Sequence, residues 1–399
     1  MPASPEIREA IRRGSWIRKM FEDGAVLKAE RGEENVFDFT LGNPYGEPPP
    51  GLSAELARLC ADPPPGLHRY MPNAGMPEAR RAAARSLAGS TGLPFTEDLL
   101  VMTVGAAGAL NVALHAILSP GDEVVVLAPY FVEYLFYIRN AGGVPVVAET
   151  DARFQIDLAA VEAALTPKTR AILINTPNNP TGAVYPDGDL AALDRILSAA
   201  EMRSGNPVYV ISDEPYRKIV FRGVTSTPAA AKIRNTLVAY SHSKDLNLPG
   251  ERIGYLAVSP RAADAAEVAG ACVFCNRVLG FVNAPALFQI AASKFEDEPA
   301  DVTVYQENRD VLLDALGRAG FDVVPPGGAF YLFPRSPVPD EMAFAAAARD
   351  EGILVVPGSG FGRSGHVRVA YCLPPETVRR SVAAWERLGR RYGGRGAGR

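Results

Sequence analysis

The sequence predicts an α/β protein with a large domain, built on a mostly parallel seven-stranded sheet between helices, and a smaller α+β domain. Two observations predict this fold. First, from about residue 99 to residue 258, short apolar segments alternate with segments of helical spacing. Second, the apolar segments are nearly continuous, which is typical of parallel strands that helices cover on both faces. The chain has 399 residues, 47% of them hydrophobic, so it can fill a core of this size.

The N-terminal part is expected to be helical and then extended. Apolar residues at helical spacing predict one or two amphipathic helices in residues 5–30, namely Ile7, Ile11, Trp16, Phe21 and Leu27. A short strand at 36–40 follows and ends in a turn at Gly42. Either Gly42 lets another group approach the backbone closely, or it is a simple turn glycine. Residues 48–75 are rich in Pro and Gly and include Tyr70 in an exposed-looking segment, and a helix begins near Met76.

Seven apolar segments predict the strands of the large sheet: 99–104, 123–127, 144–148, 171–175, 208–212, 237–240 and 255–258. A helical region at 260–318 comes next. The smaller domain is predicted from short strands at 321–324, 329–333, 353–356 and 367–370, with helices at 340–350 and 375–391. We therefore expect an N-terminal segment, 1–47, that packs with the small domain, a large cofactor-binding domain, 48–290, and a C-terminal small domain, 291–399.

Composition and charge exclude several classes of protein. A net charge of −4 gives no field that would attract nucleic acid or an anionic membrane. The sequence has no apolar run long enough to span a membrane and no apolar segment near its N-terminus, so we expect a cytoplasmic protein. Four cysteines are too few for a disulfide framework. Cys272-x-x-Cys275 lacks a second pair, which favours thiols in a helix over a zinc site, and no metal is expected.

Polar residues follow the predicted strands at the edge where an open α/β sheet binds ligands. Gly105-Ala106-Ala107 opens a helix, whose free N–H groups form an anion site. Later strands are followed by an amide, a carboxylate, a phenol, an amine and a guanidinium, from Asn179, Asp213, Tyr216, Lys244 and Arg252. We expect Lys244 on a tethered polar loop, where shielding from water favours the neutral amine. These groups match the phosphate, aldehyde and ring nitrogen of pyridoxal phosphate.

The chain resembles the fold-type I pyridoxal-phosphate-dependent aminotransferases of class I/II, the aspartate aminotransferase-like enzymes, from about residue 35 to 390. Its motifs follow the family's order and spacing: Asn179-Pro180-Thr181-Gly182, Asp213-x-x-Tyr216, Ser241-x-Ser243-Lys244 with Arg252, and Arg368 in His366-Val367-Arg368-Val369-Ala370. Jointly these motifs are specific, whereas any one alone is weak. The resemblance implies transfer of an amino group from an amino acid to a 2-oxo acid, by a homodimer with the active site at its interface.

The resemblance also implies a role for each matching residue. Lys244 would bind the cofactor and then, once substrate displaces it, move the proton at the substrate Cα. Asp213 would bind the ring nitrogen, and Asn179 and Tyr216 the phenolic oxygen. The phosphate would be held by Gly105, Ala106, Ala107, Ser241, Ser243, Arg252 and, from the other subunit, Tyr70. Phe131 would stack on the ring, the alternative being a core residue. Arg368 would bind the substrate carboxylate with two hydrogen bonds, helped by Gly42 and Asn179.

The chain departs from its aspartate-specific relatives at two positions. Some relatives carry a lysine for the distal carboxylate at the third position of the phosphate turn, where this chain has Ala107. Others use an arginine of the partner subunit just before a Ser-Asn-Pro-Pro segment. Arg277 lies one residue out of that register, before Val282-Asn283-Ala284-Pro285, so it is either a ligand for an acidic side chain or a surface arginine. Aspartate is therefore not assumed as the substrate.

Other functions remain to be weighed against transamination. The same cofactor site supports a lyase, such as a carbon–sulfur β-lyase, or an oxidase, since motifs that hold the cofactor do not decide the fate of the carbanion. A regulator on an aminotransferase-like domain would need a DNA-binding module before the first motif, where only about 35 residues stand. A hydrolase is poorly supported, because the histidines show no metal-binding spacing and no Gly-x-Ser-x-Gly occurs.

Overall fold

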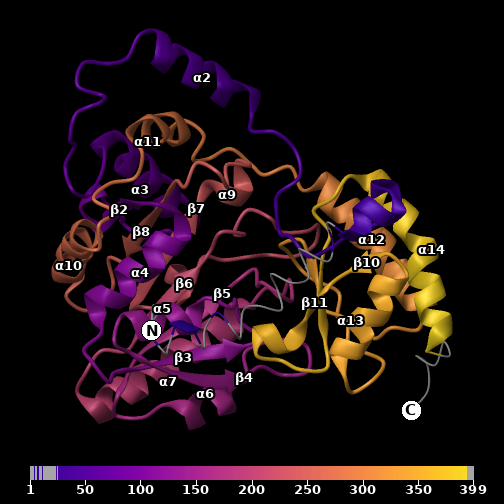
Figure 1. The fold of residues 1–399 in the computed structure, drawn as a ribbon. Helices are drawn as coiled ribbons and strands as arrows, with labels where there is room; N and C mark the ends of the chain where they lie inside the picture. The colour runs from indigo at the N-terminus through magenta and orange to yellow at the C-terminus, as the bar shows by residue number, and fades with distance from the viewer. Residues whose placement is uncertain (1–3, 5–6, 9–10, 12–23, 25, 393–399) are drawn as a thin grey trace.

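The computed structural model describes residues 4, 7–8, 11, 24 and 26–392. Most of the helical prediction for residues 5–30 lies outside the described residues; the residues described within that range, 7–8, 11, 24 and 26–30, are helical. Figure 1 shows a large lobe around a central sheet and a smaller lobe, in orange and yellow, that contains α12, α13 and α14.

The central sheet has seven strands, and the predicted fold class is confirmed. The strands are β2 (Leu100–Thr103), β3 (Glu123–Ala128), β4 (Val144–Glu149), β5 (Thr169–Asn175), β6 (Tyr209–Asp213), β7 (Thr236–Ser241) and β8 (Gly254–Val258). Their order is β2-β8-β7-β6-β5-β3-β4. Only β8 runs antiparallel to its neighbours β2 and β7, and all other pairs in this sheet are parallel.

Helices cover both faces of this sheet, because alternate residues of each strand point to opposite sides. Leu237 and Ala239 of β7 pack in the cluster that includes α4 (Gly105–Ile117) and α10 (Ala265–Val278). Val238 and Tyr240 pack on the other face, against α2 (Pro50–Ala61), α3 (Pro77–Thr91) and α11 (Ala286–Ser293). The remaining elements of the large lobe are η2 (Glu97–Leu99), α5 (Tyr134–Asn140), α6 (Leu158–Ala164), α7 (Asp187–Ser204) and α8 (Ala229–Lys232).

The reversal of β8 gives the β7–β8 connection a special position. Because the two strands are antiparallel, this connection leaves the sheet and returns to it at the same edge. It begins with the four-residue helix α9 (His242–Asp245), whose start is capped by the side chain of Ser241, which accepts a hydrogen bond from Ser243 N at 3.2 Å. Lys244 therefore lies on a short helix, and the expectation of a loop was wrong. Four residues are too few to show a helical period in the sequence.

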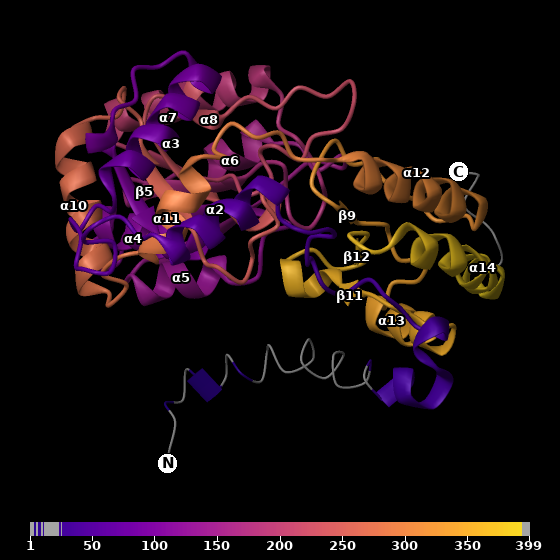
Figure 2. The ribbon, with the colours of Figure 1, turned by 90° about the horizontal axis from the view of Figure 1, so that it is seen from above.

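The small lobe has short strands in small sheets. β9 (Tyr331–Leu332), β11 (Val356–Pro357) and β12 (Val367–Ala370) form an antiparallel sheet of order β11-β12-β9. β1 (Phe37–Asp38) pairs in parallel with β10 (Ile353–Leu354), which brings the N-terminal part of the chain to this lobe (Figure 2). Further elements are η1 (Glu33–Asn35), α12 (Thr303–Arg318), α13 (Glu341–Asp350), η3 (Gly358–Phe361) and α14 (Pro375–Arg391).

The structure corrects one further expectation and adds detail to two others. Residues 321–324 form no strand: Phe321 packs on Phe344 and Trp385, and prolines that cannot donate ladder hydrogen bonds follow at 325–326. Residues 260–318 contain separate helices α10, α11 and α12. The Pro-rich segment 48–75 contains α2, which starts with a proline in its first turn, where the missing N–H costs nothing. In the described part of the chain, no helix is both long and apolar enough to cross a membrane.

Candidate active site

Lys244 lies at the carboxyl edge of the central sheet, on α9. Its amine donates a hydrogen bond of 2.8 Å to the carbonyl oxygen of Gly42 and lies 5.6 Å from the ring centroid of Phe330. Burial lowers the pKa of Lys244 to about 8, and the charges of Arg252 and Arg368 act in the same direction. A sizeable fraction of the amine is therefore neutral near pH 7–8, as a nucleophile or a base requires.

Asp213 ends β6 on the same edge and is buried. Its Oδ2 accepts a hydrogen bond of 2.5 Å from the hydroxyl of Tyr134, whereas its Oδ1 is buried without a partner among the described residues. Burial raises the pKa of Asp213 to about 7, and the hydrogen bond from Tyr134 lowers it. An unpaired buried carboxylate oxygen is costly unless a donor reaches it. The protonated ring nitrogen of pyridoxal phosphate is such a donor, so this residue fits the cofactor.

A network of amides and phenols surrounds these groups. Asn175 at the end of β5 accepts from Asn179 N at 2.6 Å through Oδ1 and donates to the carbonyl of Asp213 at 2.8 Å. The hydroxyls of Tyr216 and Tyr331 lie 2.8 Å apart. Gly42 is required beside them, because a Cβ there would lie 2.0 Å from the Tyr331 hydroxyl. Of the two readings of Gly42, the structure supports the close approach of another group.

The predicted anion site lies where α4 begins beside the β7–β8 connection. Gly105 has a φ of +71°, and a Cβ there would lie 3.0 Å from Nη2 of Arg252 and 3.4 Å from Oγ of Ser241. The hydroxyls of Ser241 and Ser243 are 2.7 Å apart. Ala106 and Ala107 follow in the first turn of α4. A helix N-terminus, hydroxyl groups and a guanidinium therefore converge, which fits a dianionic phosphate.

Arg368 of β12 reaches the site from the small lobe. It donates from Nη1 to Oδ1 of Asn179 at 3.0 Å and from Nη2 to the carbonyl oxygen of Thr40 at 2.6 Å. The guanidinium carbon lies 4.9 Å from the ring centroid of Tyr331 and 4.8 Å from that of Phe361. Its Nε is buried without a partner among the described residues. The group is thus held in place while some of its N–H donors stay available for a ligand.

Three predicted residues have other surroundings in this chain: one packs beside the site and two are exposed. Phe131 is half-buried and packs edge-on against Tyr134, with 5.5 Å between ring centroids. Since Tyr134 donates a hydrogen bond to Asp213, the Tyr134 side chain links Phe131 to Asp213. Tyr70 is 97% exposed. Arg277 is exposed on α10, with its guanidinium carbon 5.5 Å from the ring centroid of Phe274. In the described part of the chain, neither Tyr70 nor Arg277 makes a hydrogen bond, ion pair or ring contact with Lys244, Asp213 or Arg368.

Sequence reasoning missed four residues that shape this site: Tyr134, Tyr331, Thr40 and Phe361. Tyr134 carried a weak signal, since it follows the same strand end as Phe131 and a buried hydroxyl needs a partner. Thr40 acts through its backbone carbonyl, which every residue has, so its side chain gave no signal.

Comparisons with known proteins point in one direction. The model of the family "Aminotransferase class I and II" matches residues 34–384. The chain is 36% identical over 370 residues to the aspartate/prephenate aminotransferase of Thermus thermophilus. This alignment covers 91% of this chain and 93% of the relative. A solved amino transferase from Eubacterium rectale has a TM-score of 0.95 at 38% identity, covering 98% of this chain and 100% of its own. The aspartate aminotransferase of Thermus thermophilus with maleate has a TM-score of 0.82 at 32% identity, covering 92% and 96%.

Proposed function

Because the chain belongs to the class I and II aminotransferases, which transfer amino groups with pyridoxal phosphate, we propose that Lys244, Asp213 and Arg368 are the central residues of its active site. The predicted family, amino-group transfer and cofactor are confirmed, with amino acids and 2-oxo acids as substrates. One observation carries the assignment: a buried amine of lowered pKa, a carboxylate with an unpartnered oxygen and a stacked arginine meet at one sheet edge.

The proposed division of labour follows from the positions of these groups. When bound, pyridoxal phosphate supplies an electron-withdrawing ring that accepts the electron pair of the substrate Cα–H bond. Lys244 would bind the cofactor until the substrate amine displaces it, and the freed amine would then take and return the proton at Cα. Asp213 pairs with the ring nitrogen, and Asn179 and Tyr216 bind the phenolic oxygen. Gly105, Ala106, Ala107, Ser241, Ser243 and Arg252 hold the phosphate, and Phe131 packs on the ring.

The substrate carboxylate is proposed to bind Arg368, with help from Asn179 and the backbone of Gly42. The guanidinium already donates to Asn179 and Thr40, which fixes its plane for a paired contact with a carboxylate. Ala107 offers no cation for a second carboxylate, and Arg363, close to Phe361 in sequence, is already paired with Glu149. We therefore propose that amino acids with uncharged side chains are better donors than aspartate or glutamate.

A homodimer with Tyr70 in the other subunit's phosphate site is part of the proposal. Tyr70 is 97% exposed, which leaves a large ring for a partner to cover. The segment after it is held to the loop after α10 by Asn283, whose Nδ2 donates to the carbonyl oxygens of Pro72 at 3.0 Å and Asn73 at 3.3 Å. Arg277, exposed near the end of α10, is the cation that such an interface could add for an acidic substrate, so the donor panel below tests it against the proposed preference for uncharged side chains.

The domain division and the location in the cell are also proposed. The parts are the N-terminal segment, 1–47, the large domain, 48–290, and the small domain, 291–399. The β1–β10 pairing and the packing of α12 on α14 support this division. A cytoplasmic location is supported by the free thiols of the chain, Cys60, Cys272, Cys275 and Cys372, since thiols stay reduced there.

A half-reaction panel tests the function and the substrate class. The purified holoenzyme is mixed with single amino acids without an acceptor, and the cofactor's absorbance is followed; a 2-oxo acid is then added. We expect conversion by donors with uncharged side chains and reversal by the oxo acid. Ammonia release or oxygen consumption without an acceptor would instead indicate a lyase or an oxidase. Rapid conversion by aspartate that is lost in Arg277→Ala would overturn the preference for uncharged side chains and identify Arg277 as its ligand.

The dimer is tested by subunit mixing. Tyr70→Ala and Lys244→Ala proteins, each with low activity, are unfolded together, refolded and assayed. If Tyr70 serves the partner's site, mixed dimers contain one site without either change, and activity is recovered. Sedimentation of the wild-type protein as a monomer, or a mixture as inactive as its parts, would refute a shared site.

A further inference from the structure

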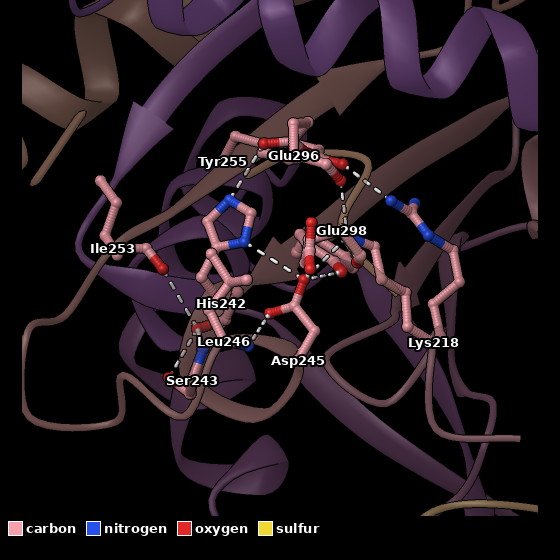
Figure 3. Close-up of polar contacts among 12 residues, drawn as sticks. Lys218, His242, Ser243, Asp245, Leu246, Ile253, Tyr255, Glu296 and Glu298 are labelled. Carbon is pink, nitrogen blue, oxygen red and sulfur yellow. Dashed lines mark hydrogen bonds and ion pairs between the residues drawn. The ribbon is translucent and has the colours of Figure 1, made fainter. Parts of the chain in front are cut away.

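A second polar cluster lies on the same short helix as Lys244 but faces away from the proposed active site. His242 and Asp245 flank Lys244 in α9, and their side chains are each 1% exposed. Figure 3 shows the His242 ring between Asp245 and Glu296, with Lys218 beside Asp245. Glu296 is 5% exposed. His242, Asp245 and Glu296 are thus buried next to the proposed catalytic lysine, with the half-buried Lys218 beside them, and the proposed reaction assigns a task to none of the four.

The geometry around His242 requires a charged ring. Its Nδ1 lies 3.3 Å from Oδ2 of Asp245, and its Nε2 lies 3.1 Å from Oε2 of Glu296. A neutral imidazole has one donor and one acceptor, whereas a carboxylate only accepts, so both contacts are favourable only when both nitrogens carry protons. Burial lowers the pKa of His242, but Glu296 and Asp245 raise it to about 10. His242 is therefore an imidazolium that joins two carboxylates.

Lys218 completes the charge balance. Its amine lies 3.2 Å from Oδ2 of Asp245 and donates to the carbonyl oxygens of Glu296 at 2.5 Å and Glu298 at 3.0 Å. Asp245 also accepts from the hydroxyl of Tyr240 at 2.6 Å. His242 and Lys218 together balance the charges of Asp245 and Glu296. The cluster is therefore neutral as a unit, and the loss of one member leaves a buried charge without its partner.

The cluster joins three segments that contribute differently to the proposed site. His242 and Asp245 belong to the helix of Lys244, and Lys218 follows the strand end that carries Asp213. Glu296 lies in the segment between α11 of the large lobe and α12 of the small lobe. The small lobe supplies Arg368. The cluster therefore connects the lysine helix both to the Asp213 segment and to the chain that leads into the lobe of the substrate-binding arginine.

We propose that His242, clamped between Asp245 and Glu296, is a positioning residue that fixes α9, and so the Lys244 amine, against the segment leading to the small lobe. This inference rests on the proposed role of Lys244. A four-residue helix has almost no internal hydrogen bonds, so its own backbone does little to fix the position of its side chains. The buried ion pairs supply the rigidity that a proton transfer at a fixed atom requires.

Two substitutions separate the contributions of the cluster. Glu296→Gln keeps the shape and removes the charge that faces Nε2 of the His242 imidazolium. His242→Gln removes the ring. His115→Gln is the matched control, because His115 is a helical histidine whose Nδ1 contacts the carbonyl oxygen of Asn111 in its own helix. The double variant, His242→Gln with Glu296→Gln, is compared with the two single variants to measure whether the effects of the two substitutions are coupled.

The first readout does not depend on turnover. Amide hydrogen exchange of the full-length holoenzyme is followed in peptides covering 241–248 and 294–302. We expect both single variants to exchange faster in both peptides, by about tenfold or more, with the double variant no worse than the worse single variant. Faster exchange in only one of the two peptides, or effects that simply add, would overturn the clamp. If either single variant fails to fold, the other still tests the clamp.

The second readout distinguishes positioning from stability alone. In the half-reaction with the best donor, we expect kcat to fall about tenfold or more and KM to change less than about threefold. The pH midpoint of the cofactor's absorbance, which reports the surroundings of Lys244, should move in the same variants. Lower thermal stability with unchanged kcat and an unchanged midpoint would refute a positioning role. A wild-type enzyme without transamination would refute the proposed function, and the exchange result would still stand.

Discussion

Replacing Arg368 by lysine tests the substrate-binding end of the proposed site. The guanidinium donates to Asn179 and to the carbonyl of Thr40, and it lies between the rings of Tyr331 and Phe361 at 4.9 and 4.8 Å. These contacts hold its plane, and the remaining N–H groups can grip a carboxylate at two points. A lysine keeps the positive charge but carries its donors on a single atom, so it cannot reproduce the paired contact.

The size of the effect follows from the lost hydrogen bond. A hydrogen bond to a charged group contributes about 1.5–3 kcal/mol. At about 1.4 kcal/mol for each factor of ten, the KM for the amino acid should rise about 10- to 150-fold. The folded protein also loses two guanidinium–ring contacts. At about 0.5–1 kcal/mol each, the free energy of unfolding should fall by about 1–2 kcal/mol.

The assay compares half-reaction KM values with cofactor affinity measured by absorbance titration. Arg335→Lys is the control, since Arg335 is exposed and lies opposite His366, close to Arg368 in the same sheet region. We expect a raised KM only in Arg368→Lys, with cofactor affinity changed less than about threefold in both variants. A KM for Arg368→Lys within about threefold of the wild-type value would move the carboxylate site elsewhere.

Three further predictions follow from the same geometry. Lys244→Ala should still bind the cofactor non-covalently but lose about 10²–10⁴-fold in turnover, because no amine remains to move the Cα proton; near-normal turnover would remove the central assignment. Asp213→Asn should lower kcat about 10²–10³-fold, because a neutral amide cannot keep the ring nitrogen protonated, and a rate close to wild type in single-turnover measurements would contradict the pairing. His242 has a folded pKa of about 10, above the unfolded value of about 6.5, so the stability it adds is full below pH 6.5 and is lost as pH rises through 10. The difference in free energy of unfolding between wild type and His242→Gln, measured in urea, should therefore shrink from about pH 6.5 to about pH 9.5; a difference that grows over this range would contradict the prediction.

The large sheet could be predicted from the sequence because its strands are buried on both faces. Apolar segments such as 171–175 are nearly continuous, and the observed strand β5 differs from that segment by two residues at one end. Short strands of the small lobe are a different case. β9 and β10 have two residues each, and their neighbours owe their place to aromatic packing rather than to an alternating pattern. Segments this short show no hydrophobic period, so a short apolar run cannot be identified as strand or loop from the sequence. For this reason the prediction of a strand at 321–324 was wrong.

In the candidate site, the charged side chains that follow apolar strands or stand in a family motif could be predicted from the sequence. The aromatic side chains and backbone groups that surround them could not. Lys244 and Asp213 are charged residues next to apolar strands, which is a rare arrangement, whereas Arg368 was expected from the motif at 366–370 that the chain shares with the family it resembles. Tyr331 looks like another core aromatic within Ala329–Phe333, and only its hydroxyl, 2.8 Å from that of Tyr216, reveals its role. His242 stands inside a recognised motif, but its carboxylate partner Glu296 is far along the chain, so its charge could not be inferred.

The antiparallel pairing of β7 and β8 also bears on the order in which the site assembles during folding. Lys244 and Arg252 belong to one short hairpin connection, so this part of the proposed cofactor site can form from local contacts. The contact of Lys244 with Gly42 joins residues 202 apart, and that of Arg368 with Thr40 joins residues 328 apart. Long closures form slowly. We therefore expect a refolding chain to be able to capture the cofactor before it can bind an amino acid, so that the cofactor itself can guide the closure of the small lobe.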